Sequence, residues 1–181
     1  MVKTIESSLE LQRMIAICSS SSGVCGRKLR LTHYELGKIM ASQICDQEKL
    51  IGKRVAIIIM MRAGLPFGLG LADDLDADCE TEIFFTPIDD FDEWKYDVII
   101  IADAVINTGK TILDFLSKLK NPNIILVSNV MSEKSLENFK DLNVYATRIS
   151  SNSYKGSKVQ VLKNGQGPDT GDRLFTNLFF D

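Results

Sequence analysis

The apolar residues of this chain fall into short runs separated by polar turns. A continuous apolar run of about four to six residues is typical of a parallel strand that helices cover on both faces. Four runs fit this description, and they are Val55–Met60, Val98–Ile101, Ile124–Val127 and Val144–Thr147. Glu82–Thr86 is predicted as a fifth, briefer strand.

The segments around these strands carry helical patterns. Helices are predicted at Ser8–Ile17, Thr32–Glu48, Leu65–Leu75, Gly109–Lys120 and Ser132–Lys140. Thr32 and Glu35 have the spacing of a capping box, so the second helix is expected to begin there. Gly37 within that helix, and Gly68 and Gly70 within the next, count against helix formation, because glycine costs about 1 kcal/mol relative to alanine in a helix interior.

Strands that alternate with helices predict an α/β fold. We expect three layers, with a mostly parallel central sheet and helices on both faces. The 181 residues suffice for a single domain, residues 1–181, with its core at about 50–147. Residues from about 148 to 176 break the alternation and are rich in Gly, Ser and Asn. They are expected to form a small hood, and the N-terminal helices are expected to pack alongside.

Composition and charge narrow the class of protein. The net charge is −3 and the basic residues form no stripe, so a nucleic-acid surface is not indicated. Charged residues interrupt the first segment, which predicts neither a secretory signal nor a membrane span. Four cysteines without a C-x-x-C pair predict reduced thiols in a cytoplasmic protein, and with one histidine they do not suit a zinc site. That histidine, His33, is expected at the surface or partly buried rather than as a general base.

The segment "DAVINTGKTI", Asp103–Ile112, has three interpretations. Ala104–Thr111 reads A-x-x-x-x-G-K-T, one residue from a triphosphate-binding P-loop. With Asp103 included, it becomes an acid at a strand end followed by T-G-x-T at the start of a helix. A helix N-terminus with no ligand is the third. The P-loop is the weaker of the first two, because apolar Val105 and Ile106 occupy the loop where glycines would wrap a triphosphate.

In the second interpretation the loop holds a sugar phosphate. Backbone amides at the start of the helix can point at an anion, and the helix dipole favours one there. These amides belong to Asn107, Thr108, Gly109, Lys110 and Thr111. Asp103 would repel a phosphate, but it is suited to accept hydrogen bonds from sugar hydroxyls or to hold a metal ion near them.

A second loop, Met61–Gly64, follows the strand Val55–Met60. Arg62 stands there beside two small residues, Ala63 and Gly64. Its fork of donors and the flanking amides could share the charge of a diphosphate. An ordinary surface arginine beside a turn is the alternative, and the residues of this loop alone favour it.

Together with the tail, these loops resemble the type I phosphoribosyltransferases, and among them the uracil phosphoribosyltransferases. "IIIMMRAGL" is similar to that group's strand and pyrophosphate-binding L-R-A-G-L loop. "IIIADAVINTGKT" is similar to its phosphoribosyl-pyrophosphate loop, in which the uracil enzymes also have a single acid, here Asp103. "GQGPDTGDRLF" is similar to their closing G-L-G-D-A-G-D-R-x-F, whose backbone reads the pyrimidine.

The resemblance implies a type I phosphoribosyltransferase fold and the transfer of phosphoribosyl from its pyrophosphate to uracil or a related base in pyrimidine salvage. The products would be UMP, or another nucleoside monophosphate, and pyrophosphate. The 5′-phosphate would bind to residues 107–111, where Lys110 would add charge or point to solvent. Asp103 would hold the ribose hydroxyls, and Arg62 with its neighbours would take the pyrophosphate with Mg²⁺. Base recognition would fall to Gly167, Asp169, Thr170 and Asp172. The resemblance also implies a homodimer.

Two features depart from the family pattern. The tail has one extra residue, and Pro168, which has no N–H to donate, takes a glycine position. The segment Pro87–Tyr96 is short and acidic where the family has a longer basic one, and it offers only Lys95 as a cation. A non-catalytic regulator that senses a nucleotide or phosphoribosyl pyrophosphate is therefore the alternative function. Trp94 and Tyr96 could stack on a base if this segment faces the site, or could anchor the loop.

Overall fold

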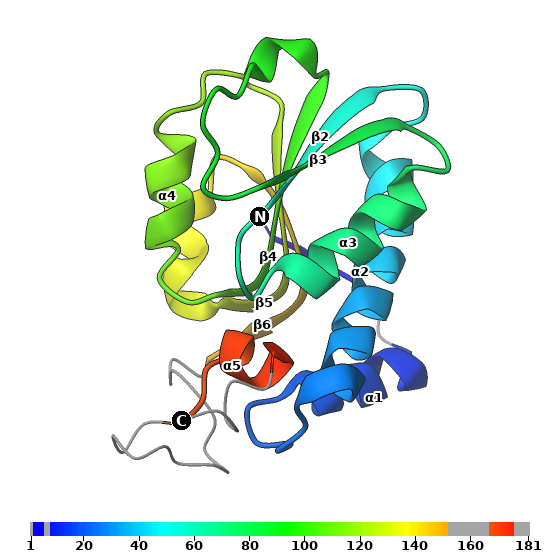
Figure 1. The fold of residues 1–181 in the computed structure, drawn as a ribbon, viewed down its shortest axis with the longest axis vertical. Helices are drawn as coiled ribbons and strands as arrows, with labels where there is room; N and C mark the ends of the chain where they lie inside the picture. The colour runs from blue at the N-terminus through cyan, green and yellow to red at the C-terminus, as the bar shows by residue number, and fades with distance from the viewer. Residues whose placement is uncertain (1, 6–7, 152–166, 176–181) are drawn as a thin grey trace.

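The described residues form one sheet of six parallel strands. A computed structural model describes residues 2–5, 8–151 and 167–175, and the strands in it run in the order β1-β6-β5-β4-β2-β3 (Figure 1). Their bounds are β1 Lys3–Thr4, β2 Arg54–Ile59, β3 Glu80–Phe85, β4 Val98–Ile106, β5 Ile124–Ser132 and β6 Asn143–Ser150. Each pair of neighbours is in parallel register, as Ile57 with Ile100 shows for β2 and β4.

Helices cover both faces of the sheet. On one face lie α2 (Gly26–Glu48) and α3 (Leu65–Leu75), with α1 (Leu9–Cys18) packed on α2. On the other lie α4 (Lys110–Leu116) and the 3₁₀ segment η2 (Glu133–Phe139). Successive side chains of a strand point to opposite faces. Ile57 and Ile59 accordingly belong to the first core, whereas Ala56 and Ile58 belong to the second. The three-layer α/β prediction is confirmed.

Several predicted boundaries were wrong, for identifiable reasons. α2 begins at Gly26, and Thr32 lies inside it, where its hydroxyl donates to the Lys28 carbonyl at 2.9 Å instead of capping a helix. α4 ends at Leu116 rather than Lys120, because the chain tightens into i→i−3 bonds there. The segment predicted as a helix at 132–140 is the 3₁₀ segment η2.

The central strands are longer than the apolar runs that predicted them. Polar residues continue the ladder, so that Asp103 of β4 pairs with Ser128 of β5. The two-residue strand β1, which was not predicted, pairs with β6. Polar side chains near the carboxyl end of the sheet therefore belong to the strands themselves rather than to the loops that follow them.

The segment from Pro87 to Tyr96 begins after the carboxyl end of β3, and its last part is held at the opposite end of the sheet. Its 3₁₀ turn η1 (Glu93–Lys95) comes just before β4 begins, beside the start of β2 (Figure 1). The buried Glu93 carboxylate accepts hydrogen bonds from the backbone N–H groups of Lys120 and Asn121, both at 2.7 Å. Tyr96 stacks on Phe91, with ring centroids 5.7 Å apart. Trp94 and Tyr96 therefore do not face the carboxyl ends of the strands, and the expectation that the segment faces the site was wrong.

Glycines let α2 and α3 pack at close range. A Cβ built on Gly37 of α2 would overlap the Phe67 carbonyl oxygen of α3, and one built on Gly70 would overlap the Tyr34 carbonyl oxygen. The residues that count against helix formation by propensity are thus those that allow the two helices to meet backbone to backbone. Close packing between helices outweighs the local propensity cost.

Gly70→Ala should therefore destabilise the protein by about 1–3 kcal/mol or more, because neither backbone can move away cheaply. Chemical unfolding monitored by circular dichroism measures this difference. The control is Glu35→Ala, at an exposed position of α2, which should stay within about 0.5 kcal/mol of the wild type. Equal effects for the two variants would contradict the close contact.

Candidate functional site

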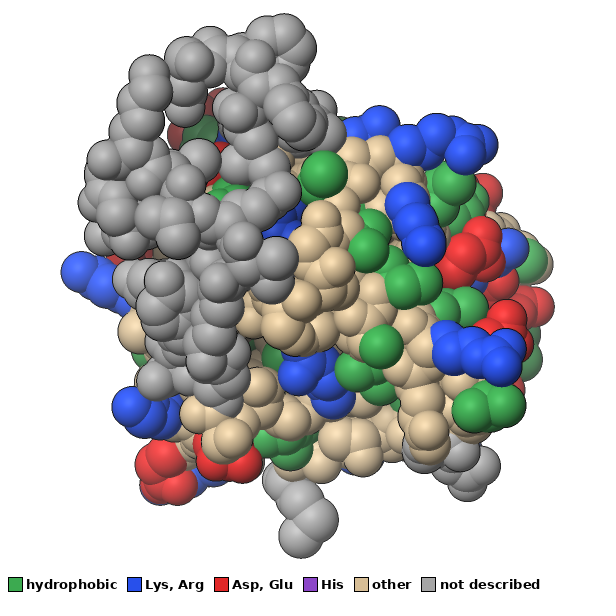
Figure 2. All heavy atoms as spheres, turned by 90° about the horizontal axis from the view of Figure 1, so that it is seen from below, with side chains coloured by type: hydrophobic (Ala, Val, Ile, Leu, Met, Phe, Trp, Pro, Cys, Tyr) green, Lys and Arg blue, Asp and Glu red, His purple; other side chains and the backbone are tan. Residues whose placement is uncertain are grey.

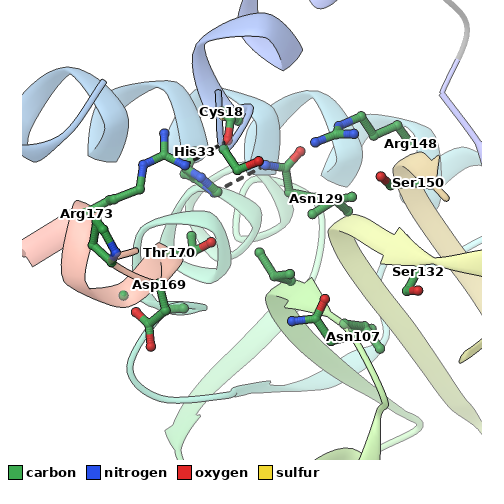
Figure 3. A pocket seen from close by; sticks show the side chains of 17 residues that line it. Cys18, His33, Asn107, Asn129, Ser132, Arg148, Ser150, Asp169, Thr170 and Arg173 are labelled. Atoms are coloured by element: carbon green, nitrogen blue, oxygen red, sulfur yellow. Dashed lines mark hydrogen bonds between the residues drawn. The ribbon is translucent and has the colours of Figure 1, made fainter. Parts of the chain in front are cut away.

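A cavity of about 270 Å³ opens at the carboxyl ends of β4, β5 and β6 (Figure 3). Ligands of open α/β sheets bind at this end of the strands. Its lining comes from seven parts of the chain, including the ends of these strands, the end of α1, α2, the loop after β2 and the tail. The polar or charged lining residues labelled in Figure 3 are Cys18, His33, Asn107, Asn129, Ser132, Arg148, Ser150, Asp169, Thr170 and Arg173.

Some of the predicted site residues meet in this cavity. Asn107 comes from the predicted phosphate loop, Ala63 from the predicted diphosphate loop, and Asp169 and Thr170 from the tail. The other predicted residues do not line it, and they are Arg62, Gly64, Asp103, Thr108, Gly109, Lys110, Thr111, Gly167 and Asp172. Gly165 and Gln166 of the tail motif lie outside the described residues.

The diphosphate loop lies directly on the backbone of β4. A Cβ built on Gly64 would stand 2.9 Å from the Ala102 carbonyl oxygen and 3.3 Å from the Asp103 Cα. Glycine at this position therefore allows the loop after β2 to reach the acid of β4. The Met61–Arg62 peptide bond is cis, and the Met61 N–H donates to the Thr86 hydroxyl at 2.9 Å. The loop after β2 therefore contacts both β4, beside Asp103, and Thr86, which follows β3.

Asp103 lies inside β4, three residues before its end, and not at the strand end that the sequence predicted. Its carboxylate is partly buried and accepts a long hydrogen bond, 3.4 Å, from the Val105 N–H. No lysine or arginine of the described residues pairs with it. Burial without a cation raises the pKa of Asp103 to about 7, although hydrogen bonds from the Val105 and Ala104 backbone oppose the rise. With this pKa, the Asp103 carboxyl changes between its neutral and charged forms near neutral pH.

The phosphate loop turns on a left-handed glycine. Gly109 has φ 73° and precedes the first residue of α4, and a Cβ there would overlap the Phe139 ring of η2. The Asn138 side chain donates to the Thr108 carbonyl at 3.2 Å, so η2 supports the loop from behind. α4 begins at Lys110, one residue later than expected, and has only seven residues. Anion binding there would depend on the loop amides and hydroxyls more than on the helix dipole.

Arg62 reaches across to the tail. Its Nη2 donates to Asp172 Oδ1 at 2.8 Å, and its guanidinium lies 6.0 Å from the centroid of the Phe175 ring. Asp172 also caps α5 (Thr170–Phe175), because its carboxylate accepts from the Asp169 N–H at 3.1 Å while Asp169 accepts from the Asp172 N–H at 2.7 Å. Asp172 thus faces Arg62 rather than the cavity.

Arg173, the next residue, ties the tail to the N-terminal helices. It is 3% exposed and donates to the Val24 carbonyl at 2.9 Å, to the Ser22 hydroxyl at 3.2 Å and to the Cys18 carbonyl at 3.4 Å. The "GDRLF" part of the tail motif therefore shapes one wall of the cavity by holding the connection between α1 and α2.

Three polar residues of the cavity escaped the sequence analysis. His33, expected near the surface, is 1% exposed on α2, and burial lowers its pKa to about 4, so it is neutral at physiological pH. Its Nδ1 lies 3.4 Å from Asn129 Nδ2. Arg148 of β6 points toward Asn129 (Figure 3). Asn129 and Arg148 each follow a predicted strand, at the carboxyl end where ligands of such sheets bind. This position is the sequence feature that could have identified them as site residues.

The surface around the site carries mixed charge. Figure 2 views the end of the molecule where α1 and α5 lie, and on its described part basic and acidic side chains are interspersed. The described residues include no group of three or more histidine, cysteine or acidic side chains placed to hold a metal ion. None of their helices is long and apolar enough to cross a bilayer.

Comparison with known proteins gives one family and one fold. A family model described as "Uracil phosphoribosyltransferase" matches residues 25–177, which include both loops and the tail. No curated protein matches the chain. Among solved structures, the AQ2163 protein from Aquifex aeolicus matches 98% of this chain and 99% of its own, with a TM-score of 0.69 and 16% sequence identity. At that identity the likeness concerns the fold alone.

The raised pKa of Asp103 predicts a pH-dependent loss of stability. The ordinary value is 3.8 and the folded value about 7, so between about pH 4 and 7 the unfolded chain binds fewer protons and the free energy of unfolding falls as pH rises. Asp103→Asn removes this loss and should gain on the order of 2–4 kcal/mol over the wild type at about pH 8, with little gain at about pH 4. Urea unfolding at the two pH values measures it.

The control for this experiment is Asp114→Asn, at an exposed position of α4. Its difference from the wild type should not change with pH. A gain for Asp103→Asn that is equal at both pH values would contradict the raised pKa.

Proposed function

The chain belongs to the uracil phosphoribosyltransferase family, and we propose that it transfers the phosphoribosyl group of phosphoribosyl pyrophosphate to a ring nitrogen of uracil or a related base. The products would be a nucleoside monophosphate and pyrophosphate. One observation carries the proposal beyond family membership: the phosphate loop, the diphosphate loop and the tail contribute Asn107, Ala63 and Asp169 to a single cavity. At least one residue from each of the three motifs thus lies at this cavity, which supports the proposal.

The 5′-phosphate would bind to the loop from Asn107 to Thr111. Gly109, with its positive φ, turns the backbone so that successive amides can face one anion, and the exposed Thr108 and Thr111 add hydroxyl donors. Lys110 is exposed as well, so its ammonium can approach a phosphate without a desolvation penalty. A single phosphate matches this loop better than a triphosphate, because apolar Val105 and Ile106 belong to β4 and leave no extended glycine loop.

Asp103 would accept hydrogen bonds from the ribose hydroxyls. Its neighbour across the sheet, the Met61–Gly64 loop, would bind the pyrophosphate through Arg62 and the amides at Ala63 and Gly64. In the structure Arg62 pairs with Asp172, and both side chains are partly exposed. An ion pair of this kind contributes about 0–1 kcal/mol, so a diphosphate can replace the Asp172 carboxylate at small cost.

Mg²⁺ would enter with the diphosphate. Magnesium in phosphate sites keeps several waters and takes one or two protein carboxylates together with substrate oxygens. The lone acid Asp103 fits that pattern, and the described residues offer no cage of three or more ligands. The ion would neutralise part of the charge that develops on the leaving group.

The resemblance to phosphoribosyltransferases implies a loose transition state. The bond from the ribose carbon to the pyrophosphate oxygen breaks as the bond to the base nitrogen forms, and the base loses its N–H proton. Little covalent work is then asked of the protein, so alignment of the two substrates and stabilisation of the leaving pyrophosphate would supply most of the acceleration. The base would lie beside Gly167, Asp169 and Thr170. A role in pyrimidine salvage, a cytoplasmic location and a homodimer belong to the same proposal.

A second function has an observation in its favour. The segment from 87 to 96, which would close over the substrate in the family pattern, runs from the carboxyl end of β3 to the far end of the sheet, where Glu93 holds its last part. A protein without this closing segment could bind phosphoribosyl pyrophosphate or a nucleotide without turning it over. That protein would be a regulator that senses the ligand on the same fold.

One experiment separates the two functions. The protein is mixed with Mg²⁺, phosphoribosyl pyrophosphate and each of a panel of bases, and both pyrophosphate release and the unfolding temperature are measured. Release with uracil or a related base supports the transferase. Stabilisation by the donor or by a monophosphate, without release for any base, supports the regulator. Stabilisation by ATP alone would contradict both.

Arg62→Ala should lower kcat/KM for phosphoribosyl pyrophosphate by about 10- to 1,000-fold, because the guanidinium would stabilise the leaving pyrophosphate. The matched control is Arg54→Ala, since Arg54 also pairs with an aspartate, Asp97, but at the opposite end of β2. Steady-state kinetics should leave that control near the wild type. Equal losses in the two variants would argue against a role of Arg62 in binding pyrophosphate.

A further inference from the structure

One wall of the cavity is polar and largely buried, and the proposed reaction does not yet use it. It consists of His33 on α2, Asn129 on β5 and Arg148 on β6, and we call it the inner wall. His33 and Asn129 are each 1% exposed. The phosphate loop lines the cavity through Asn107, and the tail lines it through Asp169 and Thr170, so the inner wall is a third, separate surface.

Each residue of the inner wall has a buried polar atom without a partner among the described residues. These atoms are His33 Nε2, Asn129 Oδ1 and Arg148 Nε. An unpaired buried polar group costs about 1–3 kcal/mol, and buried polar groups in proteins are nearly always paired. Three such atoms around one cavity indicate that a ligand supplies the missing hydrogen bonds.

The charge of the cavity lining is positive. Arg148 and Arg173 both line it, and Arg173 is bound by two carbonyls and a hydroxyl, which leave its charge uncompensated. Asp169 is the one acidic residue among the described lining residues, and it is exposed and engaged in the cap of α5. Burial also lowers the pKa of Arg148, as expected for a guanidinium that lacks an anion.

We propose that the inner wall binds a carboxylate carried by the acceptor base, so that the substrate class is a carboxylated nitrogen heterocycle rather than uracil itself. The proposal rests on the proposed function, because it names the acceptor of that reaction. The Arg148 fork can bind a carboxylate through two N–H groups. Neutral His33 and the Asn129 amide add hydrogen bonds to the ring or to the carboxylate without adding charge.

The position of the inner wall favours the acceptor over the donor. The phosphates of the donor have their own surfaces in residues 107–111 and in the Arg62 loop. The inner wall lies across the cavity from Asn107 and beside the tail (Figure 3), where the base is expected. A carboxylate on the base would therefore point away from the ribose and toward Arg148.

The test compares three acceptors that differ in one group: uracil, uracil-6-carboxylate and uracil-6-carboxamide. With Mg²⁺ and phosphoribosyl pyrophosphate, the wild type should show at least a 10-fold higher kcat/KM for the carboxylate than for either neutral compound. Arg148→Met keeps much of the side-chain length and removes the charge. It should abolish this preference without changing KM for phosphoribosyl pyrophosphate. Asn129→Asp, which places a carboxylate beside Arg148, should abolish it too.

Binding without the donor gives a second readout. Uracil-6-carboxylate alone should raise the unfolding temperature of the wild type, but not that of Arg148→Met, and free formate at the same concentration should have a much smaller effect. Without ligand, Arg148→Met should be at least as stable as the wild type, because Nε has no partner to lose. A purely structural arginine would instead make the variant less stable.

The outcomes distinguish this proposal from the proposed function. Pyrophosphate release with uracil, but with no preference for the carboxylate, overturns the inner-wall proposal and leaves the transferase standing. An equal shift by formate and by uracil-6-carboxylate overturns it as well, since the wall then binds any small anion. Binding of the carboxylate that depends on Arg148, without any binding of phosphoribosyl pyrophosphate, supports the wall as a carboxylate site and overturns the transferase.

Discussion

The buried Arg173 guanidinium is the interaction on which the site depends. It joins the tail to the connection between α1 and α2, and the Arg30 side chain adds a bond to the Leu174 carbonyl at 2.7 Å. A buried guanidinium must keep all its donors paired, so neither segment can shift without breaking several charge-assisted hydrogen bonds. With both held, the tail faces the ends of β4, β5 and β6, and the cavity has its closing wall. The "GDRLF" motif therefore has a structural role in addition to the ligand-binding role proposed for the tail.

Near Arg173, the carboxyl end of the sheet contains buried groups that lower the stability of the fold. Asp103 is buried without a cation, and the inner wall holds polar atoms without partners. At the other end of the sheet, the buried Glu93 carboxylate is satisfied by two backbone N–H groups. Local violations of good packing and pairing are expected where a protein keeps a site ready for a ligand. Among the described residues, unpaired buried polar groups at one end of the sheet, and a paired one at the other, indicate the position of a site without reference to any sequence motif.

The diphosphate loop owes its position to backbone packing rather than to side chains. Gly64 allows it to lie on β4 beside Asp103, and Gly109 allows the phosphate loop to lie on Phe139. Both loops therefore rest directly on core elements, which would hold the two proposed phosphate-binding surfaces at a fixed distance before any substrate arrives. Preorganisation of this kind is what a reaction with little covalent chemistry requires.

The sequence by itself determined the fold class and the order of the central strands along the chain, and it predicted roles for the two loops. Continuous apolar runs such as Val55–Met60 are typical of a covered parallel strand, and T-G-x-T after a strand with an acid is a local pattern. It also contained Asn129 and Arg148 as polar residues directly after such runs, although nothing local marked them as partners.

Only the tertiary structure decided which of these residues meet. His33, Asn129 and Arg148 come from three elements up to 115 positions apart, and their contact depends on the strand order and on where α2 begins. The capping-box rule misjudged Thr32, because α2 already begins at Gly26. The helices that contain Gly37, Gly68 and Gly70 form as predicted, because close packing outweighs the propensity cost of these glycines. Local rules also misjudged Trp94 and Tyr96, because the buried Glu93 carboxylate accepts hydrogen bonds from two backbone N–H groups of a distant turn and so holds that part of the segment. Local sequence sets what each segment can form, whereas contacts between distant segments set where its side chains point.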